Sequence, residues 1–162
     1  KSDIGGVKVG ISSAEEAKAT YEEIIANAKA AHPDIVPDGV EVQKMMDSGE
    51  EVIVGMIRDK QFGPMIAFGM GGIYVNLIED VSFNLAKGMS SQEIEEQIAS
   101  TKVSKLLEGY RGEAPCDVEE VREAIKRVAR LTLDFPEISE LDINPIFVYE
   151  EGSSALDIKI KL

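Results

Sequence analysis

The chain has 162 residues, of which 44% are hydrophobic and 29% are charged, and its formal net charge is −13. This length and composition are typical of one globular domain with a real core, or of a large piece of a bigger protein. The excess of acid disfavours electrostatic binding to nucleic acid, and no apolar run is long enough for a transmembrane helix. We therefore expect no nucleic-acid partner, no membrane contact and a cytoplasmic location.

Cysteine and histidine occur once each, as Cys116 and His32. A disulfide within the chain and a zinc site built on several cysteines are therefore excluded. A Ser-His-Asp triad could be built only on His32. Both residues lie in loop-like, proline-containing sequence, and we interpret both as structural.

The first half of the chain predicts strands around one long helix. Residues 7–11 and 40–46 alternate like strands, and residues 51–57 predict a strand that returns after a tight turn at 47–50. Between the first two, residues 12–31 predict a helix that is capped at Ser12 or Ser13. The helix side chains expected to face a core are Ala17, Tyr21, Ile24 or Ile25, and Ala28.

The second half predicts two more helices and a closing hairpin. Residues 62–78 predict a strand, a glycine loop and a short further strand. A helix over 90–107 is expected to be capped at Ser90 or Ser91, and a helix over 117–135 at Asp117. Residues 141–162 predict a hairpin with its loop at 150–154. This order of elements indicates an α+β fold with mixed or antiparallel strands.

The predicted terminal hairpin carries a possible metal site. Asp142 and Asn144 share one face of its first strand because side chains alternate along a strand, and Asp157 on the second strand can reach them across the ladder. Two carboxylates and an amide oxygen are ligands that Mg²⁺ or Mn²⁺ prefers. The alternative is that Asn144-Pro145 forms a bend and both aspartates are solvated. The spacing alone leaves both interpretations open.

Two further features permit a functional and a structural interpretation. The glycines in "FGMGGIYVN" (residues 68–76) either form a tight turn or a close backbone approach, or they let a phosphate come near the backbone. Arg58, at the end of a predicted strand, could neutralise a transferring phosphoryl group, or it could be an ordinary surface arginine.

Several stretches together resemble the ATP-grasp β subunit of ADP-forming acetyl-CoA and acyl-CoA synthetases, which are related to succinyl-CoA synthetase. The stretches occur in the family's order and span nearly the whole chain. They are "KSDIGGV", "VQKMM", "GEEVIVGMIRDKQFGPMIAFGMGGIYV", "EDVSFNLA", "LLEGYRGE", "ELDINPIFVYEEG" and "ALDIKI". The resemblance implies the C-terminal part of an ATP-grasp fold, with residues 1–41 as the tail of the first lobe and 42–162 as the metal-binding second lobe.

The resemblance also implies a reaction and its site. The family converts acyl-CoA, ADP and phosphate reversibly into acid, CoA and ATP through a phosphohistidine, with a CoA-binding α subunit or domain as partner, in a heterotetramer. Asn144 and Asp157 match the magnesium ligands, and Asp142 matches an acid near the phosphohistidine. Glu51 matches an acid near the nucleotide, and the backbone of Gln43, Lys44 and Met45 is expected along the adenine. We assign Arg58 a catalytic role from its position and chemistry.

The chain departs from the family pattern in two places. Asn76 stands where the family has glutamate, and Asn84 stands where it has arginine. The resemblance also implies a histidine directly before Lys1 and an upstream lobe that this sequence does not include, so the chain by itself is expected to be inactive. Two alternatives stay open: a non-catalytic regulatory module of a protein lysine acetyltransferase, and an assembly surface for the α subunit.

Overall fold

The computed structural model describes residues 4–72 and 79–162, which divide into two compact units, Lys1–Asp47 and Ser48–Leu162. The predicted lobe boundary after residue 41 stays a prediction. The short strand expected after the glycine loop, and Asn76 with it, lie outside the described residues. Within the described ranges, no helix has both the length and the apolar character needed to cross a bilayer.

The first unit contains one helix, α1 (Ala14–Ala31), whose N-cap is Ser13 as predicted. The predicted strands at 7–11 and 40–46 are wrong: residues 4–47 contain no strand. A strand needs a neighbour to complete its hydrogen bonds, and this unit offers none to these segments. The prediction that Tyr21 faces a core is also wrong, since Tyr21 is 48% exposed and α1 has no buried residue.

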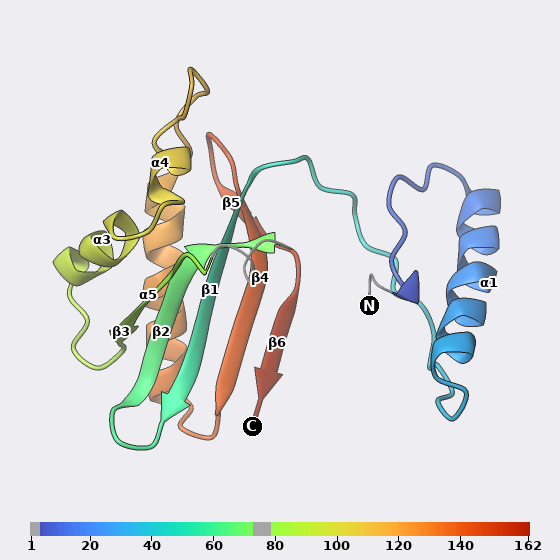
Figure 1. Cartoon of the computed structure of the whole chain (residues 1–162), viewed down its shortest axis with the longest axis horizontal. Coiled ribbons are helices and arrows are strands. Elements are labelled where there is room, and N and C mark those ends of the chain that lie inside the picture. The colour runs from blue at the N-terminus through green and yellow to red at the C-terminus, as the bar shows by residue number, and fades with distance from the viewer. Residues whose placement is uncertain (1–3, 73–78) are drawn as a thin grey trace. The chain divides into compact units, whose positions relative to one another are not determined.

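The second unit is an antiparallel sheet covered by helices on one face (Figure 1). The strand order is β3-β2-β1-β4-β5, and β6 also pairs with β4. The strands are β1 (Glu50–Asp59), β2 (Gly63–Met70), β3 (Val81–Leu85), β4 (Glu140–Val148), β5 (Ser153–Ala155) and β6 (Ile158–Lys161). The predicted hairpin at the C-terminus is confirmed as β4 with β5 and β6, and β3 was not predicted.

Three helices follow β3. They are α3 (Ser91–Ala99), α4 (Ser104–Leu107) and α5 (Val118–Asp134). Ser90 caps α3 in a complete capping box with Glu93, and Asp117 caps α5, both as predicted. The single helix expected over 90–107 is wrong. It is divided where the buried Asp80 carboxylate accepts hydrogen bonds from the backbone N–H groups of Lys102 and Val103, at 2.8 and 2.9 Å.

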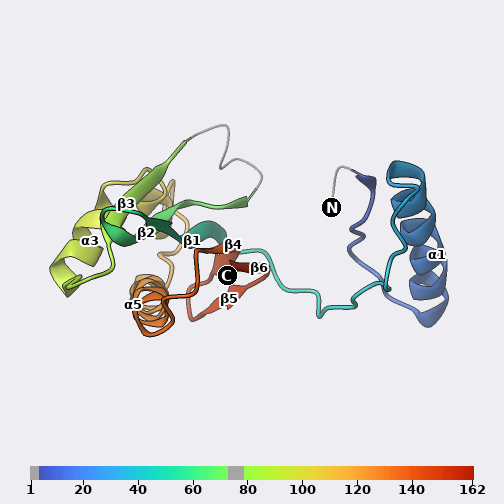
Figure 2. The same cartoon turned by 90° about the horizontal axis from the view of Figure 1, so that it is seen from below.

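The core lies between the sheet and the helices. Alternate residues of the central strands point into it, which fits the period of two of a half-buried strand. They meet the apolar stripe of α5 and two isoleucines of α3. The buried side chains include Val52, Val54, Met56, Ile66, Phe68, Leu141, Ile146, Val148, Val121, Ile125, Val128, Ile94 and Ile98. The opposite face of the sheet, here called the open face, is turned away from α5 (Figure 2).

Candidate functional site

The glycine segment after β2 crosses the neighbouring strand on the open face. Figures 1 and 2 show the end of β2 turning across β1 toward β4, on the side away from α5. The Gly71 N–H donates to the Glu51 carbonyl at 2.8 Å. A side chain on Gly71 would meet the Val52 backbone at 2.6 Å. The glycines therefore serve a close approach of two backbones, which was one of the two interpretations of the sequence.

The crossing ends against a polar side chain of β4. The Gly72 N–H donates to the Asn144 Oδ1 atom at 2.8 Å. Asn144 lies at an irregularity of the sheet, where the β1–β4 register shifts between Val52 and Val54 and the Asn144-Pro145 peptide bond is cis. Strand β4 continues through Asn144 and Pro145 despite this irregularity, and the Gly72 N–H holds the Asn144 amide oxygen in one orientation.

Glu51 of β1 also lies beside the glycine crossing. It pairs with Phe147 of β4, so its side chain lies on the open face rather than in the core. Its carboxylate packs directly against Gly72, in the space where a side chain on that residue would have to stand. The glycine crossing therefore brings together two residues that the sequence nominated separately, Glu51 and Asn144.

Asp157 is the direct neighbour of Asn144 across the ladder. The Asn144 N–H donates to the Asp157 carbonyl at 3.1 Å. The Asp157 carboxylate lies 3.6 Å from Lys159 Nζ. Since Lys159 is the register partner of Asp142, the structure places Asp142, Asn144 and Asp157 in one neighbourhood of the open face, as the alternation predicted.

Burial raises the pKa of the Asp142 carboxyl, the nearby charges of Glu140 and Asp157 raise it further, and Lys159 opposes the rise. Asp142 stands opposite Gly55 of β1, which presents no side chain on the open face. Burial outweighs the opposing charge of Lys159, so the Asp142 carboxyl binds its proton more tightly than an exposed aspartate does. Lys159 was missed in the sequence, although the alternation of "LDIK" places it on the face of Asp157.

Arg58 lies at the opposite end of β1 from Glu51, and its side chain is used by the fold. Its guanidinium donates to the carbonyl oxygens of Ile138 and Thr132, both at 2.8 Å, and of Phe135 at 3.4 Å. These groups lie at and just beyond the end of α5. The structure therefore does not bring Arg58 together with the hairpin residues, and its catalytic role stays a prediction.

Gln43, Lys44 and Met45 lie in the first unit, in irregular chain. The Gln43 side chain donates to Glu41 at 3.1 Å. Their predicted backbone contacts with adenine stay a prediction.

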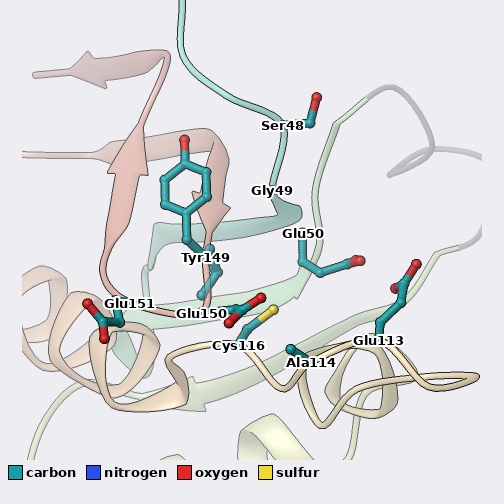
Figure 3. A pocket seen from close by; sticks show the side chains of 10 residues that line it. Ser48, Gly49, Glu50, Glu113, Ala114, Cys116, Tyr149, Glu150 and Glu151 are labelled. Atoms are coloured by element: carbon teal, nitrogen blue, oxygen red, sulfur yellow. The ribbon is translucent and has the colours of Figure 1, made fainter.

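A separate hollow of about 770 Å³ lies where β1 begins and β4 ends (Figure 3). Glu50, Glu113, Glu150 and Cys116 line it, and none of the predicted site residues does. Burial raises the pKa of the Cys116 thiol, and the three glutamates add to the rise. The thiol is therefore protonated at neutral pH and a weak nucleophile, in line with the structural role expected for it.

The oxygen atoms of Asn144 and Asp157 on the open face suit a hard cation such as Mg²⁺ that is also coordinated by a bound ligand. Among the described residues, no group of three or more histidine, cysteine, aspartate or glutamate side chains could hold a metal by itself. An amide oxygen and a carboxylate leave most coordination positions to water and phosphate, which is how Mg²⁺ is usually bound beside nucleotides. Asn144 Oδ1 can accept from Gly72 and still offer its second lone pair.

The second unit is thus an antiparallel sheet with helices on one face, and it carries oxygen-bearing side chains and the glycine crossing on the other. The chain belongs to the ATP-grasp family, whose domain model matches residues 1–162. It is 45% identical to the β subunit of acetate–CoA ligase [ADP-forming] I of Pyrococcus furiosus, covering all of this chain and 69% of that one. It is 44% identical to acetate–CoA ligase [ADP-forming] I of Archaeoglobus fulgidus, of which it covers 23%.

The structural comparison agrees. Acetyl-coenzyme A synthetase 1 of Ca. Korarchaeum cryptofilum, in complex with coenzyme A, Ca-AMPCP and HgCl⁺, superposes with a TM-score of 0.93 at 42% identity. The match covers 99% of this chain and 70% of that one. Another structure of the same protein holds coenzyme A and Mg-AMPPCP, with a phosphohistidine segment pointing towards the nucleotide site (TM-score 0.85, 40% identity, 99% and 70% covered).

Proposed function

We propose that this chain is the metal- and nucleotide-binding part of an ADP-forming acyl-CoA synthetase. The observation that supports this proposal best is that Glu51 and Asn144 meet at the glycine crossing, while Asp157 lies beside Asn144 across the ladder. The similar synthetases support it, since one of them is described with coenzyme A and Mg-AMPPCP. The complete enzyme would convert acyl-CoA, ADP and phosphate into the free acid, CoA and ATP, and it would also catalyse the reverse reaction.

Phosphoryl transfer depends on positioning and on neutralising charge more than on covalent help from the protein. Asn144 and Asp157 would hold Mg²⁺, with Mn²⁺ as the other candidate; the bound metal offsets charge on phosphate oxygens. Asp142, with its raised pKa, would orient the histidine that is phosphorylated. Gln43 to Met45 would present backbone groups to adenine. The partner is a CoA-binding α subunit or domain, in a heterotetramer, and the location is cytoplasmic.

The regulatory alternative rests on Asn76, which lies outside the described residues, and on Asn84, which replaces a family arginine. Asn84 is the register partner of the buried Ile66, so it lies on the helix side of the sheet. Its amide oxygen accepts the Leu85 N–H at 2.8 Å. This substitution therefore removes no group from the open face, and we retain the enzymatic proposal.

The test is ATP formation by the full-length protein with its CoA-binding partner, supplied with acetyl-CoA, ADP, phosphate and magnesium. We expect ATP to form only when all four are present. Omission of each component in turn is the control. Absence of ATP across a panel of short-chain acyl-CoA substrates would contradict the proposal and favour a regulatory role.

A further inference from the structure

Gly72 contacts two candidate site residues from two different strands. Its N–H is 2.8 Å from Asn144 Oδ1 on β4, and its α-carbon lies against the Glu51 carboxylate of β1. Its φ of +72° belongs to the left-handed region that favours glycine. No other described glycine has one side chain bonded to its N–H and a second, from another strand, filling its missing side-chain position.

We propose that Gly72 is a positioning residue of the nucleotide site, and this inference rests on the proposed function. Its N–H fixes which way the Asn144 amide faces, because only the oxygen can accept that hydrogen bond. Its lack of a side chain lets the Glu51 carboxylate occupy the adjoining space. One residue thereby sets the orientation of a proposed metal ligand and the position of a nearby acid.

The preceding residue explains how Gly72 is held there. Gly71 packs closely against the Val52 backbone, and its N–H donates to the Glu51 carbonyl. The main chain of Glu51 therefore anchors the crossing, while its side chain packs on the next glycine. Movement of Gly72 would displace both the carboxylate and the amide oxygen.

The Gly72→Ala variant tests this role. The new methyl group would overlap the Glu51 carboxylate, which is the flexible end of a side chain and can move aside. Alanine keeps the N–H, but relief of the overlap must displace the Glu51 carboxylate or shift the N–H that orients Asn144. We therefore expect a folded protein whose affinity for Mg-ATP, measured by titration calorimetry on the full-length protein, falls about tenfold or more, the usual scale for disturbing a contact that orients a metal ligand.

Gly88→Ala is the matched control, since Gly88 has φ +78° and nothing within 4 Å of its missing side chain. Gly88→Ala places alanine in the same left-handed backbone conformation but creates no overlap with another side chain. Its Mg-ATP affinity should stay at the wild-type value. If Gly72→Ala binds Mg-ATP as tightly as Gly88→Ala, the positioning role is wrong. If the wild type shows no magnesium-dependent affinity, the proposed function fails instead.

A second measurement needs no nucleotide. Thermal unfolding should show a larger loss of Tm for Gly72→Ala than for Gly88→Ala, and the excess should disappear when Glu51→Ala is present in both variants, because the overlap has been removed. An excess that persists without the Glu51 carboxylate would overturn the packing argument. This comparison also serves if Gly72→Ala folds poorly, since the double variant is expected to recover.

Discussion

Replacing Asp157 with alanine is expected to lower the rate of ATP formation about 100-fold or more, the scale seen when one preorganised charge-stabilising group is lost. Asp157 is the cross-strand neighbour of Asn144, whose N–H donates to the Asp157 backbone carbonyl at 3.1 Å. Without it, the proposed Mg²⁺ would keep only the neutral Asn144 oxygen from the hairpin, and charge on the phosphate would be poorly offset. The measurement is kcat in the ATP-forming assay at saturating magnesium.

Asp134→Ala is the matched control for this prediction. Asp134 is also an aspartate paired with a cation, at 2.6 Å from Arg130, but it lies on α5, away from the open face. Its removal should leave kcat unchanged. Equal activities for the Asp157→Ala and wild-type enzymes would remove Asp157 from the metal site.

Replacing Arg58 with alanine is expected to lower the free energy of unfolding by about 2–4 kcal/mol while leaving kcat unchanged in the folded protein. The guanidinium donates to three carbonyl oxygens at and beyond the end of α5. One of these belongs to Thr132, which is fully buried. Removing the donor leaves buried acceptors unpaired and takes a positive charge from the negative end of a helix. Denaturant unfolding measures the change.

Two comparisons separate this structural role from catalysis. Arg130→Ala removes an exposed arginine from α5 and should cost about 0.5 kcal/mol or less, as is usual for a surface ion pair. Arg58→Lys keeps the charge but loses the planar fork, so it should be intermediate in stability. A large loss of kcat with unchanged stability in Arg58→Ala would instead establish the catalytic role predicted from the sequence.

The sequence predicted well those elements whose signals are local. Capping residues such as Ser90 and Asp117 bond backbone groups within their own helix, and the structure confirms both. The terminal hairpin followed from alternation, which also placed Asp142 and Asn144 on one face. The strands expected at 7–11 and 40–46 failed because alternation describes a pattern of side chains and says nothing of whether a partner strand is present.

The sequence predicted the individual residues of the candidate site but not how the fold brings them together. Nothing local in "GMGG" says that these glycines cross β1 to reach Asn144, because that contact joins residues 72 positions apart in the sequence. Arg58 shows the same limit: nothing local in the sequence says that its guanidinium donates to the backbone carbonyls of Thr132 in α5 and of Ile138 beyond that helix. These contacts also join residues far apart in the sequence, so spacing does not predict them.

The proposed function requires that nucleotide binding depend on a metal held by the β4–β6 hairpin. Titration calorimetry of the full-length protein with ATP, in magnesium and then in excess chelator, tests it most directly when repeated with Asn144→Ala. We expect wild-type affinity for ATP to fall about tenfold or more on chelation, and the affinity of Asn144→Ala to be weak in both conditions. Equal affinities with and without magnesium, or an Asn144→Ala variant with the full magnesium response, would contradict it.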